Sequence, residues 1–448
     1  MTPAKIAVIG CGHVGLVMAA GLAELGHDVI GVDLSAKLVE SLCSGEVLIR
    51  EDGLPELVRK NLDEGRLVFT TSYSHAIPDA AFVFLAVDTP GTLAGAANLR
   101  NIRAATRSIA ASLNGTMPVI VNKSTSPIGT GETIEGLLEE ALSSRQMAPR
   151  IVSNPEFLQQ GRAVQDFFKP DRIVLGARDR ADAEAVAALY EELPGERVIT
   201  DLRTAEMIKY VSNSFLATRV SFINEIARLC EHIGVDIDEV VTGIASDPRI
   251  GRHFFKAGIG YGGSCLPKDV AALRYVGEVL GVATPVLSAV QQVNDNQRMS
   301  AVGRLRARLG SLEGATIAVW GLTFKGDTED TRDSPAADVV HMLLNEGARI
   351  QAFDPGIVEY PSGADEVIRP LLSPTALAAA NGADALAILS DWPEFSDVPL
   401  DEVRAAMTGR VIFDGRNMLS RTAAEAAGFA YIGVGRIART PTRRRSDR

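Results

Sequence analysis

The most constraining feature of the sequence is a glycine pattern close to its start. Residues 5–9 have the pattern of a short buried strand, which runs directly into Gly10-x-Gly12-x-x-Gly15 and then into an apolar helix. In this context the first glycine permits a tight turn, the second lets the backbone approach a pyrophosphate, and the third allows close packing of helix on strand. The helix N-terminus supplies free N–H groups to the phosphates. The pattern predicts a dinucleotide-binding unit, whose candidate loop residues are Gly10, Gly12, His13, Val14 and Gly15.

The second predicted strand, 28–32, indicates which dinucleotide binds. It ends at Asp33, roughly twenty residues after the glycines, where a carboxylate accepts hydrogen bonds from both ribose hydroxyls of NAD. NADP would need an arginine for its 2′-phosphate, but Lys37 is the only cation nearby. NAD is therefore the expected cofactor.

Two further predicted strands end in polar turns. Residues 81–87 lead into Thr89, and residues 118–122 lead into a Lys-Ser-Thr segment that ends at Thr125. Because the carboxyl ends of parallel strands line the ligand crevice, we expect Thr89 and Thr125 beside the nicotinamide. The alternative is that these hydroxyls only cap helices.

Composition and charge exclude several classes of protein. The chain has 448 residues, 46% of them hydrophobic, and a formal net charge of -11. The length suits two or three domains with their own cores, and no uncharged apolar run is long enough to span a bilayer. Four scattered cysteines favour neither a disulfide framework nor a metal site, and the acidic balance disfavours nucleic acid and anionic membranes as partners. We expect a cytoplasmic protein without a metal.

The pattern beyond residue 200 predicts the remaining architecture. Residues 204–233 form a long amphipathic helical run and another begins near Pro285, which is typical of a domain bridge and a dimer seam. The fold class is α/β: two Rossmann-like doubly wound domains joined by a central helical domain with a long helix. We place an NAD-binding domain at 1–200, a helical domain at 201–309, a second Rossmann-like domain at 310–435, and a basic, disordered tail at 436–448.

The third domain looks like a degenerate copy of the first βαβ unit. Strand 316–321, helix 335–345 and strand 348–354 repeat its order, but the loop at 322–327 lacks the full glycine pattern. A different nucleotide, held by Lys325 and Arg332, is the first interpretation. A decayed structural duplicate is the alternative.

The chemistry concentrates around Cys265. Several glycines precede it, and Pro267 marks the first turn of a predicted helix, so that Cys265 lies at a helix N-terminus. The helix dipole and the nearby Lys268 favour the nucleophilic thiolate. Asp269, one turn on, could orient or deprotonate a water. The alternative is an inert buried cysteine.

Two other patterns suit the same chemistry. Lys209 and Asn213 are four residues apart on the long helix, so they share one face and could bind one oxygen together. They could equally be an unrelated surface pair. Glu156 follows a proline at the end of a strand and could act as a base, or merely cap the next helix.

These motifs together resemble the nucleotide-sugar 6-dehydrogenases, the UDP-glucose/GDP-mannose dehydrogenase family. The resemblance covers residues 5–417 and is strongest to the members that oxidise UDP-glucose. Its motifs are the glycine pattern, Thr-Pro at 89–90, Lys-Ser-Thr at 123–125, Asn-Pro-Glu-Phe-Leu at 154–158, Lys209 with Asn213, Gly-Gly-Ser-Cys-x-x-Lys-Asp at 262–269, Phe-Lys at 324–325 and Asp-Gly-Arg at 414–416.

The resemblance implies NAD-dependent oxidation of UDP-glucose to UDP-glucuronate in two steps, by a homodimer or higher oligomer. The domain at 201–309 would serve dimerisation and catalysis, and the domain at 310–435 would bind the UDP-sugar. Cys265 would form a thiohemiacetal and then a thioester. Lys209 and Asn213 would stabilise the oxyanion, Asp269 and Thr125 would position water, and Glu156 would be the base for hydrolysis. One position departs from the family: Gln160 stands where a second glutamate is usual, which puts a role for that carboxylate in doubt.

The resemblance also assigns binding residues. The implied substrate contacts are Glu156, Phe157, Leu158, Lys209, Asn213, Arg249, Phe254, Lys256, Gly260, Phe324, Lys325 and Arg416. Arg249 in the family reaches into the neighbouring subunit's site. The implied cofactor contacts beyond the glycine loop and Asp33 are Thr89, Thr125, Lys268 and Arg332.

Four alternatives remain open. A GDP-mannose 6-dehydrogenase shares the cysteine motif, whereas 2-acetamido-sugar dehydrogenases usually have His in place of Ser264. A simple hydroxyacid dehydrogenase needs neither Cys265 nor a third domain. A nucleotide-sensing binding protein would bind the same ligands without turnover.

Overall fold

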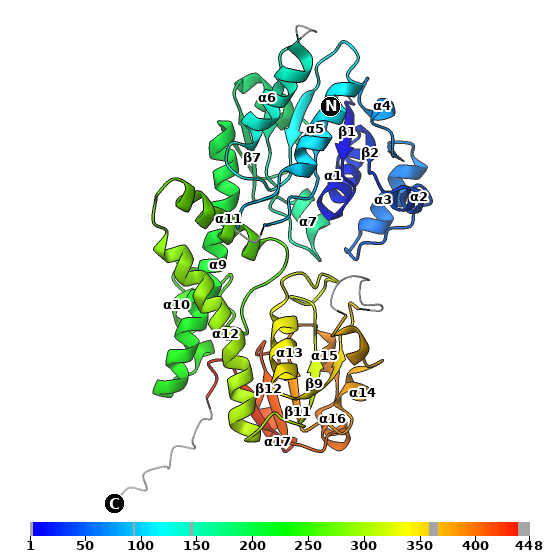
Figure 1. Cartoon of the computed structure of the whole chain (residues 1–448). Helices are drawn as coiled ribbons and strands as arrows, with labels where there is room; N and C mark the ends of the chain where they lie inside the picture. The colour runs from blue at the N-terminus through cyan, green and yellow to red at the C-terminus, as the bar shows by residue number, and fades with distance from the viewer. Residues whose placement is uncertain (1–2, 93–94, 144–146, 358–365, 438–448) are drawn as a thin grey trace, which may run out of the picture. The chain divides into compact units, whose positions relative to one another are not determined.

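The computed structural model describes residues 3–92, 95–143, 147–357 and 366–437 (Figure 1). The chain divides into two compact units. The first contains Met1–Ser212 with Ala271–Leu280, and the second contains Asn213–Val270 with Gly281–Arg448. The helical residues that the sequence suggested as a separate domain are therefore shared between the two units. The three-domain division stays a prediction.

The first unit is built on an eight-stranded sheet with the order β3-β2-β1-β4-β5-β6-β7-β8. All neighbouring strands are parallel except β6 and β7, which are antiparallel. The strands are β1 (Lys5–Ile9), β2 (Asp28–Val32), β3 (Leu67–Thr70), β4 (Phe82–Leu85), β5 (Val119–Asn122), β6 (Arg150–Ser153), β7 (Arg172–Ala177) and β8 (Glu196–Thr200).

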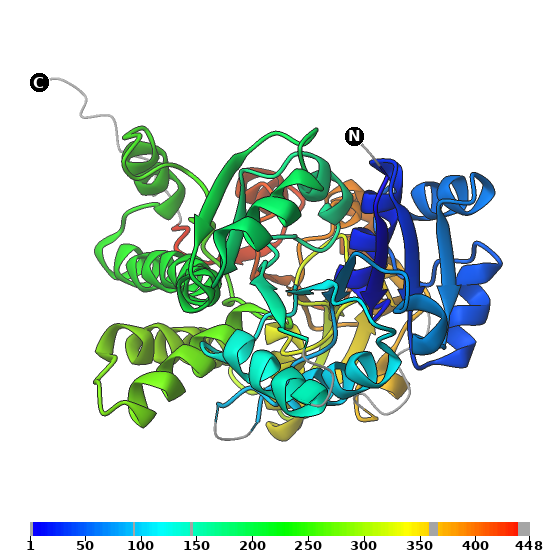
Figure 2. The ribbon, with the colours of Figure 1, turned by 90° about the horizontal axis from the view of Figure 1, so that it is seen from above.

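Helices cover both faces of this sheet (Figure 2). The helices of the unit are α1 (His13–Glu24), α2 (Ala36–Cys43), α3 (Leu54–Asp63), α4 (Tyr73–Ala76), α5 (Arg100–Ser112), α6 (Thr130–Leu142), α7 (Ala163–Phe168) and α8 (Arg180–Ala188). One core packs α1, α3, α7 and α8 on the sheet, with Leu16, Val58 and Val186 fully buried. The other packs α4, α5 and α6, with Ile109 and Ile134 fully buried. This is the doubly wound arrangement that the sequence predicts.

The second unit contains a five-stranded sheet with the order β10-β9-β11-β12-β13, whose neighbours are all parallel. Its strands are β9 (Thr316–Trp320), β10 (Arg349–Phe353), β11 (Ala385–Ile388), β12 (Val411–Asp414) and β13 (Ala430–Gly433). Its own helical segments are α13 (Pro335–Asn345), η2 (Arg369–Leu371), α14 (Ala376–Ala380), α15 (Glu394–Asp397), α16 (Leu400–Ala406) and α17 (Arg421–Ala426). Two apolar clusters cover its two faces.

Along the chain, four helices follow the last strand of the first sheet and precede the first strand of the second sheet. They are α9 (Leu202–Ile233), α10 (Ile237–Ala245), α11 (Leu266–Val279) and α12 (Pro285–Leu309). The predicted long helix at 204–233 and the helix from Pro285 are thus confirmed. Within the described ranges, no helix combines the length and the apolar character needed to cross a membrane.

Arg436, the first residue of the predicted tail, has partners in the second unit. Arg436 donates hydrogen bonds to Asp238 (2.7 Å), to the Leu419 carbonyl and to the Tyr431 hydroxyl, so it belongs to the second unit. The arginine-rich composition of this segment does not show that the Arg436 guanidinium has these partners. The predicted disorder of residues 438–448 lies outside the described residues.

Candidate active site

The glycine loop of the first unit has the geometry of a phosphate cradle. Gly10 adopts φ +94°, and a Cβ on it would lie 2.5 Å from the Ala86 carbonyl oxygen. A Cβ on Gly15 would lie 1.8 Å from the Gly10 carbonyl oxygen, so both positions require glycine. A Cβ on Gly12 would meet nothing within 4 Å, and no side chain caps the N-terminus of α1, which begins at His13. This open space beside uncapped N–H groups fits the pyrophosphate of a dinucleotide.

Asp33 is fixed at the end of β2 beside this loop. Its carboxylate accepts hydrogen bonds from the backbone N–H of Cys11 and of Ser35, each at 2.9 Å. The side chain remains partly exposed. Because each carboxylate oxygen has a second lone pair, Asp33 can still accept the ribose hydroxyls of NAD.

Glu51 is a residue of this region that the sequence reasoning missed. Its side chain is fully buried and lies 2.7 Å from the His13 ring nitrogen. It also accepts hydrogen bonds from the N–H groups of Gly161 (2.8 Å) and Ala163 (2.6 Å). Glu51 therefore ties the phosphate loop to the start of α7. No local motif marks this residue, because its partners lie far along the chain.

The polar turns after β4, β5 and β6 lie together in the first unit. The Thr89 hydroxyl donates to the Thr125 carbonyl at 2.5 Å, and the Thr125 hydroxyl lies 3.4 Å from Glu156 Oε1. Lys209 Nζ lies 2.8 Å from the same Glu156 oxygen. The other oxygen accepts the Leu158 N–H at 2.7 Å. Lys209 also lies over the ring of Phe157, 5.3 Å from its centroid.

Glu156 is held as a carboxylate in this cluster. Burial acts to raise its pKa, but the charge and hydrogen bond of Lys209, the Leu158 N–H and the charge of Lys123 outweigh burial and lower it. Glu156 is only 5% exposed. In this arrangement it is ionised and can accept a proton only as its pairing with Lys209 loosens.

Two more buried ionisable residues border this cluster. Lys123, in the Lys-Ser-Thr motif but absent from the predicted site, donates to Asn154 Oδ1 at 3.1 Å. Glu206, on α9, accepts the Gly129 and Gly131 N–H groups at the N-terminus of α6, and burial raises its pKa to about 7. The signal that could have found Glu206 is its spacing, since it lies one helical turn before Lys209.

The second unit contains the predicted nucleophile. Cys265 immediately precedes α11 and is exposed, and its carbonyl accepts the Asp269 N–H at 2.9 Å, as expected for the first turn. Asp269 is fully buried. Its carboxylate accepts Asn213 Nδ2 at 2.6 Å and Lys268 Nζ at 2.7 Å. A carboxylate with both oxygens bound is a fixed acceptor beside the nucleophile.

This arrangement corrects one electrostatic argument. We expected Lys268 to stabilise the Cys265 thiolate, but its ammonium pairs with Asp269. The Asp269 charge offsets part of the field of this ammonium at Cys265, and the N-terminal dipole of α11 also favours a thiolate.

Arg416 organises the loops around the cysteine motif. Its partly buried side chain donates to the carbonyls of Gly260 (3.1 Å), Leu389 (2.8 Å) and Phe324 (2.8 Å). Burial lowers its pKa, and the charge of Asp391 opposes this shift. Arg416 thereby joins the glycine loop before Cys265 to two strand-end loops of the second sheet.

The other predicted contacts in the second unit have internal partners. Lys256 pairs with Asp391 at 3.2 Å, Arg332 with Asp330 at 2.7 Å, and the largely exposed Arg249 with Asp247 at 2.6 Å. Lys325 lies over the Phe324 ring, 5.8 Å from its centroid. Phe254 adopts a left-handed backbone with φ +62°, which is rare for a bulky residue and is found most often at ligand sites.

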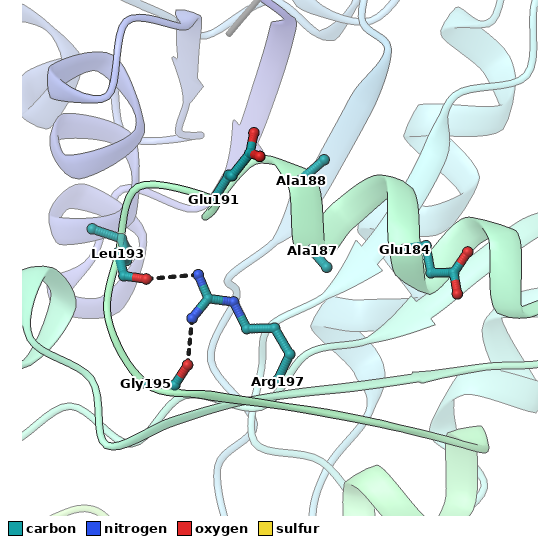
Figure 3. A pocket seen from close by; sticks show the side chains of 7 residues that line it. All are labelled: Glu184, Ala187, Ala188, Glu191, Leu193, Gly195 and Arg197. Carbon is teal, nitrogen blue, oxygen red and sulfur yellow. Dashed lines mark hydrogen bonds between the residues drawn. The ribbon is translucent and has the colours of Figure 1, made fainter.

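A separate hollow lies beside α8 in the first unit (Figure 3). Its charged residues include Arg197, which donates to the Leu193 carbonyl at 2.8 Å and the Gly195 carbonyl at 2.6 Å. The guanidinium is thus used to fix the loop before β8. Elsewhere in the described chain, no cluster of three His, Cys, Asp or Glu residues suits a metal ion.

Comparison with protein-family models identifies the relationship. The NAD binding domain of the UDP-glucose/GDP-mannose dehydrogenase family matches residues 4–194, its central domain matches 203–296, and its UDP binding domain matches 318–421. The chain belongs to this family. Its first unit accordingly carries the family's NAD-binding domain, and the cofactor is NAD.

Individual members of the family match over nearly the whole chain. UDP-glucose 6-dehydrogenase TuaD from Bacillus subtilis is 41% identical over 97% of this chain and 94% of its own. UDP-glucose 6-dehydrogenase from Rhizobium meliloti is 41% identical over 96% of this chain and 99% of its own. The structure of a UDP-glucose dehydrogenase from Pyrobaculum islandicum has a TM-score of 0.88 at 37% identity, and covers 97% of this chain and 98% of its own.

Proposed function

We propose that the protein is a cytoplasmic enzyme that oxidises UDP-glucose to UDP-glucuronate with two equivalents of NAD. The observation that carries the proposal is Cys265, exposed at the start of α11 with the Asn213–Asp269 pair one turn below it. An alcohol dehydrogenase needs no nucleophile, whereas oxidation to an acid through a thioester does. The relatives named above, UDP-glucose 6-dehydrogenases at 41% identity, support UDP-glucose as the substrate.

The proposed reaction has four stages. The C6 alcohol loses a hydride and a proton to give the aldehyde. The Cys265 thiolate adds to the aldehyde carbon, and the protonated adduct is a thiohemiacetal. Loss of a second hydride and proton gives the thioester, which water cleaves to the carboxylate and the free thiol. NAD, when bound, accepts the hydride in each oxidation.

The residues of this chain divide the remaining work. Lys209 supplies a positive charge and Asn213 an amide N–H, both of which stabilise an oxyanion on the substrate carbon. Asp269 holds Asn213 in the donating orientation at 2.6 Å. Glu156 is the proposed base that takes a proton from the hydrolytic water, with Thr125 beside it to orient that water.

Stoichiometry tests the activity. The protein is incubated with limiting UDP-glucose and excess NAD, and NADH is measured by absorbance. We expect two NADH per sugar. One NADH per sugar would indicate an alcohol-only dehydrogenase, and none would indicate a binding protein. GDP-mannose in a parallel assay distinguishes the other branch of the family, because faster turnover of that substrate would contradict the proposal.

The nucleophile has its own test. Cys265→Ser should abolish formation of UDP-glucuronate while NAD and UDP-glucose still bind, because a serine ester forms and leaves poorly. Cys43→Ser is a matched control, since Cys43 is also exposed but lies on α2. Acid formation by Cys265→Ser at the parent rate would exclude covalent catalysis at this residue.

An apolar stripe on α9 supports a dimer. Phe215, Phe222, Leu229 and Ile233 lie seven, seven and four residues apart, and each is more than half exposed within the chain. This spacing puts them on one helix face, and so large an exposed apolar surface is typical of an interface. We propose that a second copy covers it. Phe222→Asp should lower the mass measured by light scattering, whereas Glu225→Gln should not.

A further inference from the structure

The first unit buries three charged side chains at the Glu156 cluster. Lys123, Glu156 and Lys209 are 7%, 5% and 4% exposed. Lys209 forms the ion pair with Glu156 at 2.8 Å. The cluster therefore contains one more positive charge than negative charge, and the surplus belongs to Lys123.

Lys123 is held in place by a defined hydrogen-bond network. Its ammonium donates to Asn154 Oδ1 at 3.1 Å, and that oxygen also accepts the Tyr190 hydroxyl at 2.9 Å. Asn154 Nδ2 donates to the Val174 carbonyl at 2.8 Å, which fixes the orientation of the amide. The ammonium lies 5.9 Å from the centroid of the Tyr190 ring. Among the described residues, no carboxylate forms an ion pair with Lys123.

A buried ammonium without a paired carboxylate is costly, so its retention needs an explanation. Lys123 and Glu156 line one cavity of about 130 Å³, which also borders Asn154 and Tyr190. Such a polar space is large enough for several waters. The other charged groups at its walls are Arg162, Asp166, Lys169, Asp171 and Arg172.

The three buried charges act on one another. Burial lowers the pKa of Lys123 to about 8, with the charge of Lys209 adding to this shift and the charge of Glu156 opposing it. Lys123 in turn helps to lower the pKa of Glu156 against the effect of burial. At neutral pH Lys123 is mostly protonated, so its charge acts on Glu156.

We propose that Lys123 is a positioning residue that acts through Glu156: its charge, fixed by Asn154 and Tyr190, keeps Glu156 ionised and ready to accept the proton of the hydrolytic water. This inference rests on the proposed role of Glu156 in thioester hydrolysis. Lys123 itself touches neither the substrate carbon nor Cys265 in this account. Its contribution is the electrostatic field at the carboxylate.

The pH dependence of kcat tests the inference. We call the fall of kcat at low pH the acidic limb of the pH profile. In the parent enzyme this limb should report the ionisation of Glu156. Lys123→Met removes a charge that acts on Glu156 through a poorly screened interior, so we expect the limb to move upward by about one pH unit. Well above the limb, where Glu156 is ionised in both proteins, parent and variant should converge. Lys123→Arg, which keeps the charge, should leave the limb near its parent position.

A second readout follows the covalent intermediate. Because a protonated Glu156 cannot take a proton from water, Lys123→Met should accumulate more thioester on Cys265 than the parent does at a pH on the acidic limb of the parent, seen as an adduct by intact-protein mass after acid quench. Lys169→Met is the matched control, because Lys169 borders the same cavity but is exposed. It should change neither the limb nor the adduct.

The outcomes separate the inference from the proposed function. If Lys123→Met lowers kcat by the same factor at every pH and the acidic limb does not move, Lys123 has only a structural role and the inference is overturned. If Glu156→Gln keeps the parent limb, the role of Glu156 itself is wrong. Should Lys123→Met fail to fold, Asn154→Asp puts a compensating carboxylate beside the ammonium at 3.1 Å. That variant must move the limb upward too, and an unmoved limb overturns the inference.

Discussion

The β1-α1-β2 segment of the first unit and the β9-α13-β10 segment of the second start from the same plan. Each first strand ends in a glycine with a left-handed backbone, Gly10 at φ +94° and Gly321 at φ +93°. In each, a Cβ would collide with the neighbouring strand end: at 2.5 Å with the Ala86 carbonyl oxygen, and at 2.3 Å with the Ser390 Cβ. The tight turn is thus required in both units, whatever ligand each binds.

The two segments differ two residues later. Gly12 leaves open space at the N-terminus of α1. Its counterpart Thr323 is fully buried, donates its hydroxyl to Asp354 at 2.9 Å and accepts Trp392 Nε1 at 3.0 Å. A side chain and its hydrogen bonds occupy the position that a pyrophosphate requires in the first unit.

The carboxylates that follow β2 and β10 also differ: the one in the first unit is more exposed and has fewer internal partners. Asp33 is partly exposed and accepts two backbone N–H groups. Asp354 is 3% exposed and accepts the N–H groups of Leu322, Thr323 and Gly356 as well as the Thr323 hydroxyl. The position of the carboxylate that we expect to bind ribose in the first segment is occupied in the second by an internal hydrogen-bond acceptor. Dinucleotide binding therefore depends on the open space beside the loop. The order of strands and helices alone does not provide this space.

The largest expected effect comes from copying the second loop into the first. Gly12→Thr puts a side chain into the open space, so we expect the affinity for NAD to fall by about 100-fold or more, roughly 2.7 kcal/mol. Isothermal titration calorimetry with NAD measures the change. Gly136→Thr is the control, because Gly136 is exposed on α6 and a Cβ there also meets nothing within 4 Å. Unchanged NAD affinity in Gly12→Thr would show that the open space is not the cofactor site.

The reverse change tests whether the second loop is structural. Thr323→Ala removes the acceptor of Trp392 Nε1 and one donor to Asp354, so we expect a loss of about 2 kcal/mol in the free energy of unfolding of the second unit. Urea unfolding followed by tryptophan fluorescence measures it. Thr242→Ala, whose hydroxyl bonds only within the exposed face of α10, should cost less than about 0.5 kcal/mol. A cost for Thr323→Ala as small as that would contradict the structural role.

Much of this contrast could be predicted from the sequence. The strand at 28–32 and the helix at 335–345 were placed with the bounds that β2 and α13 have. The reason is local, because glycine turns, buried strands and helix starts are determined by neighbouring residues. The place of Cys265 at a helix start was predictable for the same reason.

The residues that sequence reasoning missed depend on distant partners. Glu51 binds His13 and the start of α7, and Lys123 binds Asn154, which no local pattern indicates. The pairing of Lys268 with Asp269 was missed for another reason: neighbouring residues on a helix start can turn toward each other, and charge counting assigned that ammonium to Cys265. The motifs indicated candidate side chains, and the fold shows which of these side chains form ion pairs with one another.

A smaller effect is expected for cofactor choice. Asp33→Asn removes the charge that repels a 2′-phosphate, so the ratio of kcat/KM for NAD over NADP should fall by about tenfold. Steady-state rates with both cofactors measure the ratio. Asp79→Asn, on the exposed surface of the same unit, should leave the ratio as it is. A ratio that does not fall in Asp33→Asn would place cofactor selection elsewhere in the loop.

The smallest effect concerns the strand ends that follow β4 and β11. Asp391, after β11, is surrounded by partners: burial acts to raise its pKa, but the charges of Arg416 and Lys256 and the Gly326 N–H outweigh burial and lower it to about 2. Since the folded state then binds fewer protons than the unfolded state between about pH 2 and 4, the free energy of unfolding falls as pH drops through that interval. Asp391→Asn should therefore flatten the dependence of the urea midpoint on pH between about pH 2 and 4. Asp88, the counterpart after β4, is exposed, so Asp88→Asn should retain the parent slope. Equal slopes in the parent and Asp391→Asn would mean that Arg416 and Lys256 do not stabilise this carboxylate, and that the loops joined by Arg416 are held by its three carbonyl bonds alone.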